Sequence, residues 1–288
     1  MQDTRPTNSP AARFIYIVAL WLACGTGRGI TVRFRFTTLI MALKKSPIPA
    51  VVVTGAGSGV GRATVLKFAA EGWRVALIGR RAEALAETIA LVPRALRKNL
   101  AALPCDLGDA TAVTAMARAA LTRFGRIDVL VNAAGNNIPR RSLGELSRAD
   151  YTAVMDANVT GVLYAVQAFL PTMRKQGAGT VVIVGSEAGK QASAKAGAAY
   201  VVSKFGATGL TQTINAEERP NGLRACCIFP GDIDTPLLNK RPVPPSAEAR
   251  TRMMQPEDIA ACVWFAATLP QRATVEEILV RPSRPWVG

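Results

Sequence analysis

The strongest constraint on the fold is a regular alternation of two residue patterns between residues 49 and 280. Short runs rich in valine, isoleucine and leucine, typical of buried strands, alternate with longer segments whose apolar residues recur every three or four positions, as in helices. A helix after each strand lets the next strand run parallel and covers the sheet on both faces. We therefore expect an α/β fold: a single doubly wound domain with a mainly parallel seven-stranded sheet and helices on both faces.

The same pattern places the individual elements. The expected strands lie near residues 49–53, 74–78, 100–105, 127–131, 180–184, 224–229 and 275–280. The expected helices begin after Gly61 and then lie near residues 82–91, 110–124, 148–174, 200–216 and 257–268. On the long helix, one set of apolar residues serves either the core or a contact between subunits, and the sequence leaves both open: Val154, Val162, Val166 and Phe169.

The N-terminal part of the chain does not share this alternation. We expect residues 1–45 to be a dispensable extension and residues 46–288 to form the domain. Residues 14–24 resemble the apolar region of a signal peptide, but these eleven residues are fewer than the roughly 20 that a membrane-spanning helix needs. No stable membrane insertion is expected, and the extension is either a targeting segment or a start-site artefact.

Composition excludes several classes of site. The chain has no histidine, which removes Ser-His-Asp and Cys-His catalysis and most zinc sites, so no metal is expected. The five cysteines form no Cys-x-x-Cys pair and are typical of small buried residues in a reducing compartment, so a cytoplasmic location is expected. The net charge of +15 is compatible with a nucleic-acid partner, but the basic residues are spread along the chain rather than clustered, so no nucleic-acid binding is expected.

A glycine-rich turn lies between the first expected strand and the first helix. Its glycines permit positive φ and let backbone N–H groups approach a pyrophosphate at the positive end of a helix. A dinucleotide-binding turn requires this position between a strand and a helix. The expected cofactor contacts in the turn are Gly55, Ser58, Gly59, Val60 and Gly61.

The residues after the second strand indicate which dinucleotide is bound. An acidic residue there would bind the ribose hydroxyl of NAD, but Arg80 and Arg81 stand in its place. A guanidinium can bind the 2′-phosphate of NADP through two hydrogen bonds, so NADP(H) is favoured over NAD(H). The alternative is that both arginines only begin a solvated helix.

Further motifs follow the glycine turn in a fixed order along residues 47–282. They are Asn132-Ala-Ala-Gly135, Asn158, Ser186, Tyr200-x-x-x-Lys204 and Pro230-Gly231-x-Ile233-x-Thr235. With Thr54-Gly55-x-x-x-Gly59-x-Gly61, this series resembles the short-chain dehydrogenase/reductase family, including its 3-oxoacyl-carrier-protein reductases. Gly185 departs from the pattern, because a serine frequently precedes the family's catalytic serine. The resemblance implies a Rossmann-type fold and an oxidoreductase that uses a nicotinamide cofactor.

The spacing of Tyr200 and Lys204 suits acid–base chemistry. Residues four apart lie on one face of a helix, and a nearby ammonium favours the phenolate of a tyrosine, whose pKa is ordinarily about 10. The resemblance implies that Tyr200 gives a proton to the carbonyl oxygen, Lys204 also binds the nicotinamide ribose, Ser186 holds the oxygen and Asn158 fixes a water. Considered singly, Ser186 could cap a turn and Asn158 could be a surface amide.

The resemblance adds further cofactor contacts. For Asp106 the alternative is a cap for the helix that begins at Ala110. Besides Tyr200 and Lys204, the contacts implied outside the glycine turn and the arginine pair are Asp106, Leu107, Asn132, Pro230, Gly231, Ile233 and Thr235.

Together these features predict an NADP(H)-dependent enzyme that acts on a small-molecule carbonyl compound or secondary alcohol. The alternatives are a non-catalytic dinucleotide sensor or scaffold of the same fold, and a basic nucleic-acid binder. A homodimer or homotetramer is expected from the resemblance. Basic residues in the expected substrate loops permit an anionic substrate: Arg140, Arg141, Lys190, Lys195, Lys240 and Arg241.

Overall fold

The computed structural model describes residues 48–284. Seven strands in this range form one sheet: β1 (Ala50–Thr54), β2 (Arg74–Gly79), β3 (Leu100–Pro104), β4 (Val129–Asn132), β5 (Gly179–Val184), β6 (Leu223–Pro230) and β7 (Glu277–Val280). The α-helices of the same range are α3 (Gly59–Ala70), α4 (Ala82–Ala90), α5 (Ala110–Phe124), α6 (Arg148–Met155), α7 (Gly161–Gln176), α8 (Ala198–Glu218), α9 (Ala247–Arg250) and α10 (Pro256–Thr268). The expected extension, residues 1–45, lies outside the described residues, and its dispensability stays a prediction.

The strand order is β3-β2-β1-β4-β5-β6-β7, and every neighbouring pair is parallel. The order reverses between β1 and β4, which is where a doubly wound sheet opens a crevice at the carboxyl ends of its strands. The expected α/β fold is confirmed, with seven strands at the expected places and parallel pairing throughout.

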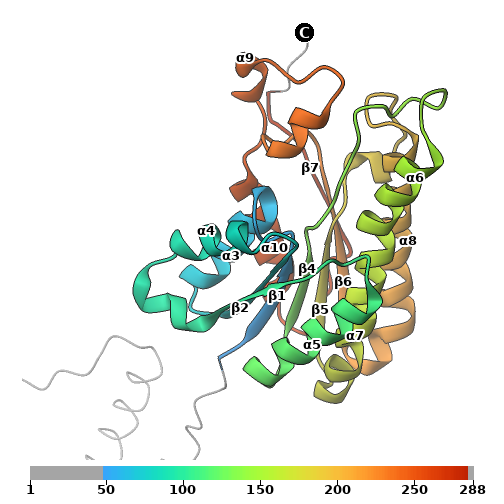
Figure 1. Cartoon of the computed structure of the whole chain (residues 1–288). Coiled ribbons are helices and arrows are strands. Elements are labelled where there is room, and N and C mark those ends of the chain that lie inside the picture. The colour runs from blue at the N-terminus through green and yellow to red at the C-terminus, as the bar shows by residue number, and fades with distance from the viewer. Residues whose placement is uncertain (1–47, 285–288) are drawn as a thin grey trace, which may run out of the picture. The chain divides into compact units, whose positions relative to one another are not determined.

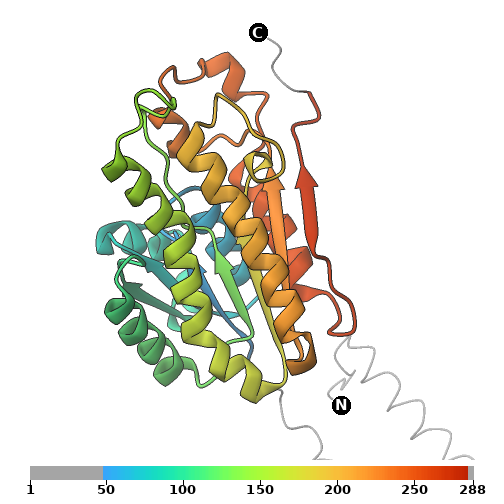
Figure 2. The same cartoon turned by 90° about the vertical axis from the view of Figure 1, so that its right-hand side faces the viewer.

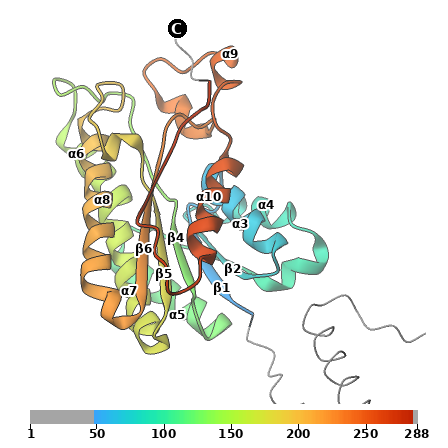
Figure 3. The same cartoon turned by 180° about the vertical axis from the view of Figure 1, so that it is seen from behind.

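Helices cover both faces of the sheet (Figures 1 and 3). On one face α5, α7 and α8 pack over a core that includes Phe124, Phe169 and Ile214. On the other face α3, α4 and α10 pack over a core that includes Phe68 and Leu85. Strands β1, β4 and β6 are buried along their whole length because both of their faces meet helices, which is why they read as continuous apolar runs, whereas the edge strands β3 and β7 are partly exposed.

The expected single helix over residues 148–174 is interrupted. One turn of π-helix, η2 (Asp156–Thr160), joins α6 to α7. This turn carries one residue more than an α-helical turn would, a feature that occurs frequently at functional sites. Figure 2 shows the resulting long helix lying beside α8 in front of the sheet.

The apolar residues predicted on this helix belong to the core. Val154, Val162, Val166 and Phe169 are all buried within the chain, so the core interpretation is right for them and the subunit-contact interpretation is wrong. The segment Arg148–Gln176 is long and apolar enough to cross a membrane by length and composition alone. Its packing against α5 and the sheet accounts for that composition.

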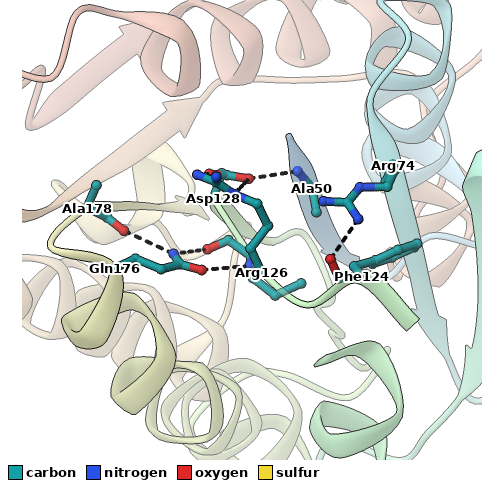
Figure 4. A network of polar contacts seen from close by, with 8 residues as sticks. Ala50, Arg74, Phe124, Arg126, Asp128, Gln176 and Ala178 are labelled. Carbon is teal, nitrogen blue, oxygen red and sulfur yellow. Dashed lines mark hydrogen bonds and ion pairs between the residues drawn. The ribbon is translucent and has the colours of Figure 1, made fainter. Parts of the chain in front are cut away.

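A polar network closes the amino ends of the central strands (Figure 4). Asp128 accepts a hydrogen bond from the N–H of Ala50 at 2.8 Å and pairs with Arg126. Gln176, at the end of α7, both accepts from the N–H of Ile127 and donates to its carbonyl. These contacts hold β1, β4 and α7 together at the amino ends, and the candidate site lies at the opposite, carboxyl ends.

Candidate active site

The glycine turn after β1 is tightly closed. Gly55 and Gly59 have φ values of +68° and +50°, which side chains other than glycine rarely adopt. A Cβ atom on Gly61 would lie 2.2 Å from the carbonyl oxygen of Gly55, so this approach also requires glycine. Because α3 begins at Gly59, its first backbone N–H groups border the turn, as anion binding at a helix N-terminus requires.

The end of β4 packs directly against this turn. The hydroxyl of Thr54 accepts hydrogen bonds from the N–H groups of Ala133 and Ala134, both at 3.1 Å. A Cβ atom on Gly55 would lie 2.8 Å from the Cα of Ala134. Asn132 is buried, and its side-chain amide has no hydrogen-bond partner among the described residues. Asn132 thus lies beneath the turn, within the sheet.

A cavity of about 190 Å³ opens above the glycine turn. It is bounded by the ends of β1, β4, β5 and β6 and by one face of α8. Most of the predicted cofactor contacts line it: Gly55, Ser58, Gly59, Val60, Tyr200, Lys204, Pro230, Gly231, Ile233 and Thr235. The predicted residues outside its lining are Gly61, Arg80, Arg81, Asp106, Leu107, Asn132 and Asn158.

The two arginines follow β2 at its carboxyl end. Arg80 and Arg81 are exposed, and Arg81 occupies the cap position of α4. The glycine turn packs on the same helix, since a Cβ atom on Gly57 would lie 2.9 Å from the Cβ of Ala84. Both arginines therefore stand at the end of the strand next to the glycine turn, and both also begin a solvated helix.

Asp106 does not cap α5. The cap is Asp109, whose carboxylate accepts from the N–H groups of Thr111 and Ala112. The carboxylate of Asp106 instead accepts from the N–H of Gly108 at 3.0 Å, within its own turn. The capping alternative is therefore wrong. Asp106 is exposed at the end of β3, whereas Leu107 is buried against Gly161 of α7.

Tyr200 and Lys204 lie one helical turn apart on the same face of α8. The Nζ atom of Lys204 is 5.4 Å from the centroid of the Tyr200 ring and donates to the carbonyl of Val184 at 2.9 Å. Lys204 is 5% exposed, although lysine is almost never buried without a partner. The helix thus brings a cation and a phenol together at the wall of the cavity, as the spacing predicts.

Ser186 follows the end of β5 and faces the same space. Its hydroxyl accepts from the N–H of Ala188 at 3.2 Å, so the turn-capping reading is correct. Ser186 also lines the cavity beside Tyr200, which the functional reading requires. The departure at Gly185 has a packing reason, because a Cβ atom there would lie 2.8 Å from the sulfur of Cys227.

Asn158 sits in the π-helical turn and is buried. Its amide oxygen accepts from the N–H of Asn136 at 2.7 Å, and its amide nitrogen donates to the carbonyl of Asn136 and to the hydroxyl of Ser203. The surface-amide reading is therefore wrong. Asn158 fixes the loop after β4 against α8, next to Lys204: a Cβ atom on Gly135 would lie 3.5 Å from the Asn158 oxygen and 3.7 Å from Nζ of Lys204.

A second, larger cavity of about 510 Å³ adjoins the first, and seven residues line both: Ser186, Tyr200, Pro230, Gly231, Ile233, Thr235 and Leu237. Its walls come from the loops after β4, β5, β6 and β7, where the sequence places the substrate loops. Of the basic loop residues, Arg141, Lys195 and Arg241 line it. Lys190 instead pairs with Glu277, and Lys240 donates to Asn136.

Several lining residues of the larger cavity escape the sequence patterns. Glu187, Asp232 and Arg281 belong to none of the motifs, yet all three face this space. Arg281 pairs with Glu187 across about ninety residues of chain, a contact that only the folded sheet creates. The sequence offers one indirect signal for them, namely that each follows the carboxyl end of a strand.

Comparison with known proteins agrees with this geometry. The model of the short chain dehydrogenase family matches residues 49–244. A sepiapterin reductase of Chlorobaculum tepidum is 34% identical over 239 residues, which cover 81% of this chain and 95% of that protein. An uncharacterized oxidoreductase of Staphylococcus aureus strain MW2 is 31% identical over 231 residues, covering 80% and 96%.

Solved structures extend the similarity to the fold. The closed form of a serine dehydrogenase complexed with NADP+ has a TM-score of 0.75 at 26% identity and covers 83% of this chain and 97% of its own. An alcohol dehydrogenase from the archaeon Thermococcus sibiricus, complexed with 5-hydroxy-NADP, has a TM-score of 0.73 at 27% identity and covers 83% and 99%. The chain therefore belongs to the short-chain dehydrogenase/reductase family of oxidoreductases.

Proposed function

We propose that this protein transfers a hydride between NADP(H) and a carbonyl compound or secondary alcohol, with Tyr200 as the acid/base. One observation carries the proposal: Tyr200 and Ser186 line both cavities, and Lys204 stands beside the phenol on the same helix. A residue that must touch a cofactor and a substrate at once has to lie where their spaces meet. Tyr200 and Ser186 have that position.

The residues of the smaller cavity fit a nicotinamide dinucleotide. The glycine turn brings backbone N–H groups to its floor, and Gly59 leaves room beneath Thr235, whose methyl group a Cβ atom on Gly59 would approach to 3.4 Å. The start of α3 supplies the positive end that a pyrophosphate favours. When bound, the cofactor supplies or accepts the hydride, and the protein supplies placement and electrostatics.

Preference for NADP(H) over NAD(H) rests on the charge beside the turn. Arg80 and Arg81 are exposed at the end of β2 and form no ion pair with the other residues of 48–284, so both can reach a phosphate. Arg62, nearer the turn, already donates a hydrogen bond to the carbonyl of Gly57 and forms an ion pair with Glu87. The serine dehydrogenase and alcohol dehydrogenase structures hold NADP+ and 5-hydroxy-NADP, which agrees with this preference.

The protein's own residues then have separate tasks. Tyr200 donates a proton to the carbonyl oxygen in reduction and accepts the hydroxyl proton in oxidation. Lys204 stabilises negative charge on the phenol oxygen. Ser186 donates a hydrogen bond to the substrate oxygen, and Asn158 holds the loop beside Lys204 through its two bonds to Asn136. The water that the resemblance assigns to Asn158 would have to use its remaining acceptor capacity, because both N–H groups are bonded.

The test is a screen of carbonyl compounds and alcohols, followed at 340 nm with each cofactor. Tyr200→Phe should lower kcat by about 10²–10⁴-fold and leave NADPH affinity unchanged, because proton transfer is lost and the ring is kept. Tyr151→Phe is the matched control, since Tyr151 is exposed on α6 away from both cavities. Equal inactivity of wild type and Tyr200→Phe with intact NADPH binding would favour a dinucleotide sensor instead.

A homodimer or homotetramer and a cytoplasmic location are part of the proposal. Four large apolar side chains are exposed on the adjacent helices α6, α7 and α8, which supports a contact between copies: Tyr151, Leu163, Val202 and Phe205. Sedimentation of the full chain measures the oligomeric state, and a monomer at micromolar concentration would contradict this part.

A further inference from the structure

The wall of the larger cavity beside Tyr200 carries a cluster of like charges. We call Arg141, Lys195 and Arg241 the cationic cluster; all three line the cavity. One carboxylate lies among them: Asp232 pairs with Nζ of Lys195 at 3.1 Å and with the guanidinium of Arg241 at 2.5 Å. Two of the three cations therefore share a single anion.

Arg141, the third cation, has backbone carbonyls as its hydrogen-bond acceptors. Within residues 48–284 its guanidinium donates to the carbonyls of Ile138, Lys195 and Lys240, and to no carboxylate. These bonds join the loops after β4, β5 and β6 and place Arg141 beside both other members of the cluster. They use three of the five N–H groups of the guanidinium, which leaves two for another acceptor.

The cluster is costly without an anion. Arg141 is 6% exposed, and its burial, followed by the charge of Arg241, lowers the pKa of its guanidinium. Gly197 packs on the same side chain, with a Cβ atom there only 2.5 Å from the Cβ of Arg141, so the residue cannot swing away from the cavity easily. A fold that holds cations together in this way is stabilised when an anion enters between them.

The rest of the lining does not supply the missing anion. Besides Asp232, the carboxylate that lines the cavity is Glu187. Glu187 is paired with Arg281, so neither carboxylate offsets Arg141. The lining also includes apolar side chains: Ile233, Leu237, Leu238 and Met253.

We propose that the substrate is an alcohol or carbonyl compound that carries a carboxylate, a hydroxy or oxo acid, and that the cationic cluster binds this carboxylate. The proposal rests on the oxidoreductase function proposed above and names its substrate class. The carboxylate serves only in binding, and none of its bonds forms or breaks in the reaction. In oxidation the carbinol C–H bond breaks with transfer of its electron pair to NADP+, the hydroxyl proton passes to Tyr200, and the carboxylate leaves unchanged.

The experiment compares α- and β-hydroxy acids with their methyl esters, in which the reacting alcohol is kept and the charge removed. With NADP+ and low salt, kcat/KM for the favoured acid should exceed that of its ester by about ten- to hundredfold, the range of hydrogen bonds to charged groups. Added salt should shrink this ratio, since a partly open cavity is screened. A third comparison, hydroxyacetone phosphate against hydroxyacetone with NADPH, tests whether the cationic cluster binds a phosphate instead of a carboxylate.

Two variants of opposite charge change sharpen the test. Arg241→Gln removes one cation and should raise KM for the acid with little effect on the ester, whereas Asp232→Asn removes the shared anion and should lower KM for the acid. Arg118→Gln makes the same charge change as Arg241→Gln on the exposed side of α5 and should change neither. The esters also report folding, because a damaged variant would lose both substrates together.

Each outcome decides the matter. Turnover of acids over esters, with opposite shifts in the two variants, supports the proposal. Esters turned over as well as acids, or the phosphate turned over and the acids refused, would overturn the carboxylate while leaving the oxidoreductase function intact. If no alcohol or carbonyl compound of either charge reacts although NADPH binds, the proposed function fails, and this inference fails with it.

Discussion

Replacing Gly61 by alanine tests whether the closed glycine turn is what binds the cofactor. The added Cβ would lie 2.2 Å from the oxygen and 2.5 Å from the carbon of the Gly55 carbonyl. Ordinary contact begins near 3.4 Å, so Gly55 would have to move by about 1 Å. Overpacking of this kind costs about 1–3 kcal/mol when the structure is forced to keep its shape.

The free protein can relax by opening the turn, but the bound form has to close it again. The strain then appears in binding, and NADPH affinity should fall by about fivefold to about 150-fold. Titration of NADPH by fluorescence measures this change. Thermal unfolding, recorded in parallel without cofactor, reports how much strain the free protein retains.

Gly209→Ala is the matched control. Gly209 lies on the exposed face of α8, and a Cβ atom there meets nothing within 4 Å. The same substitution should therefore stabilise the protein by about 0.5–1 kcal/mol, because alanine favours a helix over glycine. NADPH affinity should not change. If Gly61→Ala binds NADPH as tightly as wild type while Gly209→Ala behaves as expected, the role assigned to the closed turn is wrong.

Three further predictions concern stability and reactivity. The buried guanidinium of Arg224 donates to the hydroxyl of Thr180 and to four carbonyls at and just beyond the end of α10, those of Ala267, Leu269, Pro270 and Ala273. Arg224→Met should therefore lower the free energy of unfolding in urea by about 2–4 kcal/mol, and Arg224→Lys should have an intermediate effect. Equal stability of Arg224→Met and wild type would show that desolvation cancels these bonds. The hydrogen bond from Arg174 holds the pKa of Glu218 below its usual 4.5. Its stabilisation is therefore present at neutral pH and lost as pH falls through the lowered pKa, and Glu218→Gln should be less stable than wild type at pH 7 with the difference closing in acid, whereas a constant difference would contradict this assignment. Burial raises the pKa of Cys226 to about 12 and of Cys227 to about 11, so a thiol reagent should modify neither in the native protein at pH 8, and modification at the rate of the denatured chain would contradict their burial.

The sequence predicts the order of strands and helices because that order is written in local apolar spacing. β2, α5 and β5 begin and end within a few residues of their expected bounds, since Gly72, Asp109 and Gly177 mark where the flanking helices begin or end. The glycine turn and the Tyr200–Lys204 pair are equally local, because each is set by spacing within a single element. These parts need no knowledge of the rest of the fold.

The parts that the sequence misses depend on contacts between distant segments. The π-helical turn leaves no mark on apolar spacing, and it is held by the bonds from Asn158 to Asn136 and Ser203. The sequence places Arg141 in a substrate loop, but it gives no sign that its guanidinium is buried and bonded to carbonyls from two other loops. Asp106 and Asp109 are only three residues apart in sequence, and which of them caps α5 depends on where the backbone turns into the helix.

The π-helical turn also lets the chain hold one more residue without disturbing the core. Each residue of a π-helix rotates the backbone less than the roughly 100° of an α-helix, so about five π-helical residues turn it as far as about four α-helical ones. Deleting one residue between Asn158 and Val162 would therefore close the turn into a regular α-helix and leave Phe169 and Met173 facing inward. The change would fall instead on the wide turn that carries Asn158, so the extra residue preserves the bonds from Asn158 to Asn136 and Ser203 rather than the packing of α7.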